Sequence, residues 1–263
     1  MKKIIIKIIK KTPLQFIYRY LKKEKLIKQD SPIPQKFLSF YSVFLRNNSL
    51  VFDVGANYGN RSKVFRKLGA QVIAFEPQEK CYDYLVSYFW GDSKIKIEKC
   101  ALGEKSYETS MLISNHSVLS TLSKEFVEKT QVSGRFIDRT WVGSQAVKVK
   151  TLDEFIMKHG TPCFIKIDVE GFEHEVIKGL NHPIPAISLE YARENFANLL
   201  GALKKISKLG DYKYQFSPQE SLILSNHNWK NFDQISEELD NYSGLEWGDV
   251  YCVLKNEEFN FYT

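Results

Sequence analysis

The sequence Leu50-Val-Phe-Asp-Val-Gly-Ala-Asn-Tyr-Gly-Asn60 joins a short apolar run, an acid and two glycines four positions apart. The residues that follow have apolar side chains at positions 64, 65 and 68, which is the spacing of a helix. Because glycines at such a turn let the backbone approach a ligand closely, this strand, turn and helix predict a ligand site after the first strand of an open α/β sheet.

The alternation of strand and helix continues along the chain. A run of parallel units followed by a closing antiparallel hairpin is the expected layout, with the sheet covered by helices on both faces. Predicted strands lie at 50–53, 71–75, 94–98 with a turn at 100–103, 163–167 and 186–189. Further strands are predicted at 212–216, 221–224 and 250–254, with no strong helix between these last three.

Residues 114–145 interrupt this rhythm. The segment is polar and has no clean period, so we expect a loop-rich insert that acts as a lid over an acceptor. It follows a possible added strand at 108–113, and the strand pattern returns at 147–150. Thr151-Leu-Asp-Glu154 is a capping box, which predicts that a helix begins there.

Positive charge is concentrated at the start of the chain. Residues 1–28 hold nine Lys and Arg19 against Glu24 alone, a net charge of +9, which leaves a net charge of −3 on the remainder. Such asymmetry is typical of an arm that meets an anionic surface. We expect residues 1–34 to form a basic amphipathic helical arm with a linker, and residues 35–263 to form the main domain.

The arm has two interpretations. Thr12-Pro-Leu-Gln15 is a capping box that predicts a helix, with Leu14, Ile17 and Leu21 on one side. Such a helix either makes peripheral contact with an anionic membrane or packs on its own domain or a partner subunit. The preceding residues 1–11 are too short and too charged to cross a bilayer, because Lys7 breaks their apolar run.

The four cysteines form neither a CxxC pair nor a cluster with histidine. This pattern disfavours a zinc site and a disulfide framework, and it favours a reducing compartment. We therefore expect a cytoplasmic protein that contacts a membrane only peripherally, at its inner face and through the arm.

Carboxylates gather at the predicted strand ends. In a parallel sheet these ends meet at one edge, where ionised acids repel one another unless donors or a cation face them. Any single acid of this kind could instead cap the following helix, but the whole set indicates a functional site. The acids are Asp53, Glu76, Asp168, Glu170 and Glu190.

The spacing of these acids indicates a nucleoside ligand. Glu76 follows Asp53 by 23 positions, where an acid accepts hydrogen bonds from a ribose diol. The turn lacks both the Gly-x-Gly-x-x-Gly of a dinucleotide site and the Gly-Lys-Ser/Thr of a P-loop. Because Asp53 would repel phosphate and attract an ammonium group, S-adenosylmethionine fits this pattern best.

Taken together, Asp53-Val-Gly-Ala-Asn-Tyr-Gly59, Phe75-Glu-Pro77, Leu152-Asp153 and Ile167-Asp-Val-Glu-Gly-Phe-Glu173 resemble the FkbM family of S-adenosylmethionine-dependent methyltransferases. The likeness covers roughly residues 49 to 255, and the last block is its most specific part. It implies a Rossmann-like α/β fold with a seven-stranded, mostly parallel sheet whose last strand is antiparallel.

The resemblance also implies a set of cofactor-binding residues. The glycine turn would hold the methionine part, Glu76 the ribose hydroxyls, and Gln78 with the 100–102 turn the adenine. Cys100 stands where many related enzymes have an acid or amide, so adenine recognition here is expected to rest on backbone or stacking contacts. The full set is Asp53, Gly55, Ala56, Asn57, Tyr58, Gly59, Glu76, Pro77, Gln78, Cys100, Ala101, Leu102 and Asp168.

The resemblance further implies O-methylation of a hydroxyl on a sugar, a glycan or a small molecule. Transfer would be direct and in line, so the protein mainly aligns the acceptor and takes its proton. Asp168 is the first choice for the base, and no metal is expected, although several carboxylates could together hold Mg²⁺. The other candidates for base or acceptor binding are Glu170, Glu173, Glu190 and His116.

Two other classes of function remain open from the sequence. The fold could be a non-catalytic nucleoside-binding or membrane-docked interaction module, or an enzyme that uses a nucleotide sugar or NAD. A nucleic-acid substrate is disfavoured, because the main domain is mildly acidic and Asp168-Val-Glu-Gly171 replaces the Asn/Asp-Pro-Pro-aromatic block of amino-methylating enzymes. The oligomeric state is not evident from the sequence.

Overall fold

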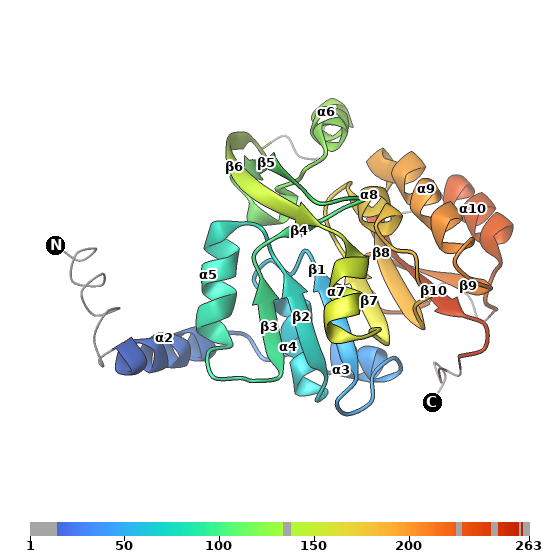
Figure 1. Ribbon diagram of the computed structural model, residues 1–263. Helices are drawn as coiled ribbons and strands as arrows, with labels where there is room; N and C mark the ends of the chain where they lie inside the picture. Colours follow the sequence, from blue (N-terminus) through green and yellow to red (C-terminus); the bar gives the residue numbers. More distant parts are fainter. Residues whose placement is uncertain (1–14, 134–137, 225–227, 243–246, 258, 260–263) are drawn as a thin grey trace.

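The computed structural model describes residues 15–133, 138–224, 228–242, 247–257 and 259. Seven strands form the main sheet in the order β3-β2-β1-β7-β8-β10-β9 (Figure 1). The strands are β1 Leu50–Val54, β2 Gln71–Phe75, β3 Ile95–Glu98, β7 Phe164–Ile167, β8 Ala186–Ala192, β9 Tyr212–Pro218 and β10 Trp247–Leu254.

The strand directions confirm the expected Rossmann-like sheet. β10, the last strand of the chain, pairs antiparallel with both β8 and β9, and the neighbours β3, β2, β1, β7 and β8 pair in parallel. The order runs outward in opposite directions from β1 and β7, which is the kind of crossover point where α/β sheets bind ligands beyond the strand ends.

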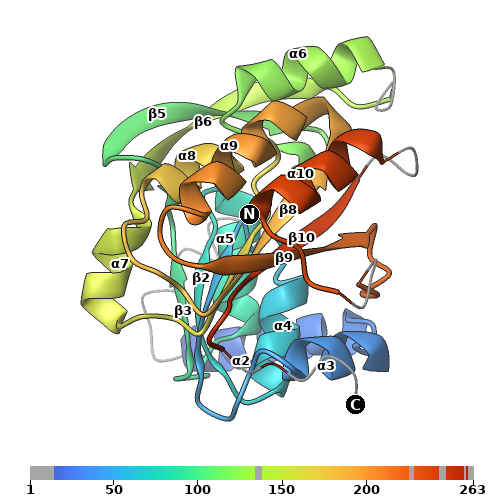
Figure 2. The same ribbon diagram turned by 90° about the vertical axis from the view of Figure 1, so that its right-hand side faces the viewer.

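Helices cover both faces of this sheet. Side chains of α7 Leu152–His159, α8 Glu173–Lys178, α9 Phe196–Ile206 and α10 Phe232–Asn241 pack in one apolar core. Side chains of α3 Gln35–Ser42, α4 Asn60–Lys67 and α5 Glu79–Tyr88 pack in a second core on the opposite face. The two views in Figures 1 and 2 show these two layers on either side of the strands.

The insert is more regular than its sequence predicted. β5 Tyr107–Ser114, β6 Trp141–Lys150 and β4 Ala101–Leu102 form a second sheet in the order β4-β6-β5. The short helix η1 Ser117–Leu119 and helix α6 Lys124–Ser133 lie within the insert, above the carboxyl edge of the main sheet (Figure 1). Within residues 114–145 the structure thus describes η1, α6 and the start of β6 joined by loops, which is more regular structure than expected, and the added strand at 108–113 is confirmed.

Two further expectations near the carboxyl terminus are corrected. Residues 221–224 are not a strand, and α10 lies between β9 and β10, where no strong helix was expected. Asn231 and Gln234 form a capping box at its start, a signal that the sequence contained. β8 continues to Ala192, because it pairs with β10 as far as Trp247, so Glu190 lies inside the strand rather than at its end.

Helix α2, Gln15–Gln29, lies against α5 near the amino ends of the strands (Figure 1). The Lys23 ammonium donates a hydrogen bond to the Trp90 carbonyl at 2.8 Å, and Asp30 beyond the helix pairs with Lys63 at 2.9 Å. The capping box expected at residues 12–15 extends outside the described residues. In the described part of the chain, every helix is too short or too polar to cross a membrane.

Candidate active site

A pocket with about 520 Å³ of empty space, the open solvent at its mouth included, lies at the carboxyl ends of β1, β2 and β7. Its described lining contains three carboxylates and no Lys or Arg. The lining residues are Val54, Gly55, Asn57, Phe75, Glu76, Pro77, Gln78, Cys100, Ala101, Leu102, Met111, Ser117, Val118, Ser120, Leu122, Asp168, Val169, Glu170 and Phe172.

The glycine turn brings the first strand close to the loop after β7. Gly55 has a φ of +82°, and a Cβ at this position would overlap the backbone oxygen of Asp168. The Gly55 and Ala56 amides both donate to the Phe75 carbonyl at 3.0 Å, which fixes the turn to β2. A residue without a side chain is therefore required at Gly55 for the turn and the Asp168 loop to meet.

Glu76 is held by backbone amides. Its carboxylate accepts hydrogen bonds from the Asn57 N–H at 2.6 Å and from the Gln78 N–H at 2.7 Å, and its side chain is buried at the edge of the pocket. Burial raises the pKa of Glu76 to about 7, although the two N–H donors act in the opposite direction. Each oxygen retains acceptor capacity, which suits a ligand diol.

The opposite wall of the pocket comes from the insert. The Gln78 amide donates to the Ser117 carbonyl at 3.0 Å, and the Ser117 hydroxyl donates to the Asn57 side-chain oxygen at 3.3 Å. The Thr121 hydroxyl donates to the Glu170 carbonyl at 2.6 Å. The insert is thus bonded to both sides of the pocket, and its four lining residues, Ser117, Val118, Ser120 and Leu122, were not among the predicted site residues.

A buried ammonium stands behind Asp168. Lys166 is 1% exposed, and its Nζ lies 3.1 Å from Asp168 Oδ2 and 3.0 Å from Asp249 Oδ1. Burial lowers the pKa of Lys166, but the carboxylates of Asp168 and Asp249 outweigh burial and raise it well above its ordinary value. The ammonium therefore remains charged and anchors Asp168, whose side chain is 40% exposed at the pocket.

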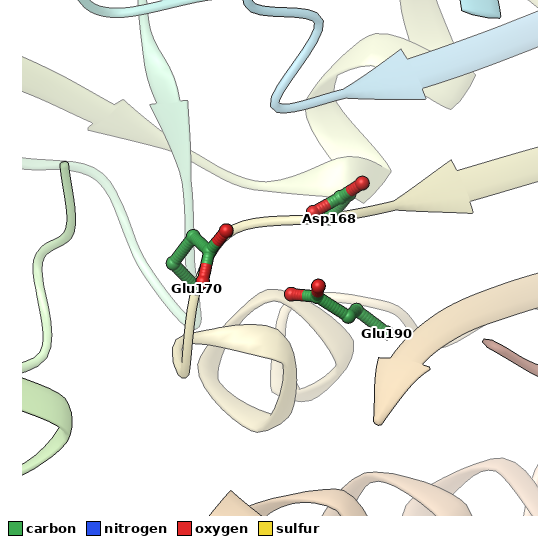
Figure 3. Close-up of side chains that lie close together, drawn as sticks. All are labelled: Asp168, Glu170 and Glu190. Carbon is green, nitrogen blue, oxygen red and sulfur yellow. The ribbon is translucent and has the colours of Figure 1, made fainter. Parts of the chain in front are cut away.

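Asp168, Glu170 and Glu190 point toward one another (Figure 3). One carboxylate oxygen from each lies within 4.8 Å of the others, a spacing that could hold a metal ion. Burial, followed by the charges of Glu170 and Asp168, raises the pKa of Glu190 well above its ordinary value. The cluster therefore retains a proton to higher pH than an isolated glutamate does.

Glu173 supports the loop rather than the pocket. Its buried carboxylate accepts from the Val169 N–H at 3.2 Å and the Gly171 N–H at 3.1 Å. Burial raises the pKa of Glu173 to about 7, against these backbone donors. Its hydrogen bonds hold the chain between Asp168 and α8 in the shape that presents Glu170, which has a left-handed φ of 54°.

The structure brings most of the predicted site residues together, with some exceptions. Asp53 is buried below the turn, accepts from the Ser62 hydroxyl at 2.5 Å and has its pKa raised by burial. His116 lies within the insert and is exposed. Of the predicted residues, those that do not line the pocket are Asp53, Ala56, Tyr58, Gly59, Glu173, Glu190 and His116, and those that do are Gly55, Asn57, Glu76, Pro77, Gln78, Cys100, Ala101, Leu102, Asp168 and Glu170.

Some site residues were missed by sequence reasoning. Lys166 lies between two buried apolar residues of β7, so its polar character in a buried strand was the available signal. Met111 and Phe172 line the pocket as apolar neighbours, and nothing in their local sequence distinguishes them from core residues. Asp249 pairs with Lys166 across 83 positions of sequence, which no local pattern predicts.

The fold and pocket define an α/β protein that binds a nucleoside cofactor with a positive charge. Three carboxylates without a lining cation suit hydroxyls and a sulfonium or ammonium group, and they do not suit a pyrophosphate. Glu76, held by backbone amides, has the acceptor capacity that a ribose diol requires.

The methyltransferase FkbM domain family matches residues 53–216, well over half of the chain, so the protein belongs to the FkbM methyltransferase family. It is a methyltransferase, and its cofactor is S-adenosylmethionine, for which the pocket residues are chemically suited. No curated protein matches the chain.

Solved structures with a similar fold share little sequence with this chain. A precorrin-6Y C5,15-methyltransferase from Geobacter metallireducens is 9% identical, with a TM-score of 0.45 and 84% of this chain and 86% of that chain covered. An rRNA methylase from Streptococcus thermophilus is 12% identical, with a TM-score of 0.43 and coverage of 86% and 97%. A TehB-like methyltransferase from Corynebacterium glutamicum is 10% identical, with a TM-score of 0.42 and coverage of 93% and 100%.

Proposed function

We propose that the protein is an O-methyltransferase that acts on a hydroxyl of a sugar, a glycan or a small molecule. The observation that carries this proposal is the position of Asp168: its carboxylate lines the pocket, is partly exposed and is anchored by the Lys166 ammonium. A fixed carboxylate beside the pocket can accept the proton of an acceptor hydroxyl.

The cofactor would be oriented by residues on the β1 and β2 side. S-adenosylmethionine supplies an already activated methyl group, so little covalent chemistry is required of the protein. Glu76 would accept hydrogen bonds from the ribose, and the turn at Gly55 would hold the methionine part close to Asp168. The protein's contribution is then alignment of the two reactants and removal of one proton.

The acidic cluster would also bind the acceptor. Glu170 lines the pocket and Glu190 lies beside it, so both carboxylates can accept hydrogen bonds from neighbouring hydroxyls. A polyhydroxylated acceptor suits this surface. Nucleic acid suits it less, because residues 29–263 have a net charge of −3 and the pocket has no described cation in its lining.

The test is methyl transfer from radiolabelled S-adenosylmethionine to a panel of monosaccharides, oligosaccharides, phenols and RNA. Asp168→Asn should lower kcat about a hundredfold or more, the usual contribution of a general base, and calorimetry measures separately what Asp168 contributes to cofactor affinity. Glu170→Gln is the matched variant, and we expect it to raise KM for the acceptor instead.

Two results would contradict the proposal. One is methyl incorporation into RNA alone, with none into any hydroxyl acceptor. The other is an Asp168→Asn variant with the wild-type kcat. Because calorimetry with S-adenosylhomocysteine reports cofactor binding separately, a failure of acceptor chemistry is distinguishable from a failure to bind the cofactor.

A further inference from the structure

Helix α2 exposes a group of apolar side chains, of which Ile17, Tyr20 and Leu21 lie away from the half-buried side. Phe16 and Ile27 flank this group, beside Trp90 and α4 respectively. In the described chain, twelve large apolar side chains are highly exposed, and five of them lie on this one helix. Each of the other seven lies on a different element or loop. Scattered exposed apolar residues are normal, but a group of five is not. The five are Phe16 at 60%, Ile17 at 57%, Tyr20 at 55%, Leu21 at 61% and Ile27 at 42% exposed.

The domain holds α2 by its other side. Tyr18, Lys22 and Leu26 are half-buried toward the domain, and no residue of the helix is fully buried. The ring contact between Phe16 and Trp90, with centroids 6.2 Å apart, is its one aromatic contact with the body among the described residues. A surface helix ordinarily packs its apolar face inward, so this orientation leaves the apolar face for another occupant.

The same helix is strongly basic. Its sequence has five Lys or Arg and one acid, Glu24, which gives a net charge of +4. Arg19, Lys25 and Lys28 are exposed, and Lys25 lies one turn beyond Leu21 on the same stripe. Lysines in such positions extend their ammonium groups past an apolar surface into the polar layer beyond it. The preceding residues 1–14 add five lysines and no acid.

Charge decides between the occupants that an apolar face could accept. A second copy of the chain in a two-fold dimer would place two +4 helices against each other, because such an interface uses the same surface on both subunits. An anionic lipid surface matches both properties at once, since its headgroups attract the lysines and its acyl boundary accepts the apolar side chains.

We propose that the outward face of α2 docks the protein on an anionic lipid surface. The helix lies in the plane of the interface, with Ile17 and Leu21 inserted into the acyl boundary and Lys25 and Lys28 among the headgroups. This surface is separate from the pocket and does not depend on the acceptor or on the reaction.

The experiment is cosedimentation of the full-length protein with vesicles of phosphatidylcholine alone and with vesicles of equal parts phosphatidylcholine and phosphatidylserine. The wild type should bind only the anionic vesicles. Lys25→Gln with Lys28→Gln should weaken binding about thirtyfold, at about fivefold for each basic residue near the surface. Ile17→Asp with Leu21→Asp should abolish binding.

The matched control is Met157→Asp with Ile223→Asp, which exchanges two apolar side chains that are 77% and 70% exposed away from α2. It should bind like the wild type. Because α2 buries no residue fully, the α2 variants should fold, and unchanged affinity for S-adenosylhomocysteine verifies this.

Three outcomes overturn the proposal: wild type that sediments with neither kind of vesicle, equal binding to neutral and anionic vesicles, or an Ile17→Asp/Leu21→Asp variant that binds as the wild type does. A wild type that is dimeric without lipid and becomes monomeric in that variant would assign the face to a second copy instead.

Discussion

Two sets of carboxylates stand at the carboxyl edge of the sheet, and they are stabilised in opposite ways. Glu76, after β2, is bonded to the amides of Asn57 and Gln78. The cluster of Asp168, Glu170 and Glu190 is crowded with like charge and is anchored by the Lys166 ammonium. The first arrangement relies on neutral dipoles, and the second relies on charge.

This contrast explains how one edge of the sheet can both bind a neutral diol and take up a proton. Amide donors hold a carboxylate in place without a counter-ion, so its free lone pairs remain available to a neutral diol. The Lys166 ammonium offsets part of the like charge of the acids and holds the partly exposed Asp168 carboxylate at the pocket, where a proton must be taken up. The proposed division into cofactor side and acceptor side rests on this contrast.

The largest expected effect comes from removing the charge that holds the cluster. Lys166→Met leaves Asp249, which is 6% exposed, without its buried partner. Breaking a buried pair costs about 3–5 kcal/mol of unfolding free energy, which urea denaturation measures. Lys158→Met, which removes an exposed ammonium paired with Glu98, is the control and should cost less than about 1 kcal/mol. Equal losses in the two variants would show that Lys166 has no special role.

The next effect concerns Glu76. Glu76→Gln replaces an oxygen that accepts an N–H with an amide group that is itself a donor, so one of the two backbone donors loses its partner. Hydrogen bonds to charged groups contribute about 1.5–3 kcal/mol, so affinity for S-adenosylhomocysteine should fall about tenfold to a hundredfold. Calorimetric titration measures it. Glu79→Gln, at a carboxylate that is 69% exposed, is the control. An equal fall in affinity in this control would contradict the assignment of Glu76 to the ribose diol.

The third prediction uses pH to separate the two sets. Burial raises the pKa of Glu76 to about 7, above its unfolded value, so the group holds a proton in the folded protein at lower pH. Because the diol binds the ionised form, cofactor affinity should fall about tenfold for each pH unit below about 7. The same titration on Glu76→Gln should be flat in this range. A wild type whose affinity does not change with pH would show that the diol does not bind this carboxylate.

The fourth prediction is that removal of metal ions has no effect on the rate of methyl transfer. Lys166 already supplies the positive charge that faces Asp168, so methyl transfer should proceed at the same rate with a chelator as with added Mg²⁺. Initial rates in EDTA and in magnesium buffer measure this. If EDTA abolishes activity and magnesium restores it, the three acids of the cluster bind a cation, and Asp168 is a ligand rather than the base.

The sequence predicted the sheet well because its strands are short apolar runs that end in acids. Glu76 and Asp168 were placed correctly at one edge, since parallel strands end on the same side. The position of Glu190 could not be predicted, because β8 is extended by pairing with β10, about 60 residues downstream. The anchoring role of Lys166 could not be predicted for the same reason, because its partner Asp249 lies on β10.

The insert was the least predictable region. α6 has a weakly amphipathic sequence, so its helix depends on packing that includes the buried Phe126. Its start is capped by Ser123, whose hydroxyl accepts a hydrogen bond from the Phe126 N–H at 3.1 Å. β6 carries alternating exposed residues whose partners lie in β5. In contrast, α10 had a readable start at Asn231 and Gln234, and missing it was an error of interpretation rather than a lack of signal.

The position of α2 has a consequence for the size of the acceptor. The helix lies near the amino ends of the strands (Figure 1). The pocket residues follow the carboxyl ends of β1, β2 and β7, so the height of the sheet lies between the helix and the pocket. A strand of five residues is on the order of 17 Å long. A protein docked through α2 would hold its pocket that far from the lipid. A lipid-linked acceptor would then need a polar chain of comparable reach, whereas a freely diffusing acceptor would need none.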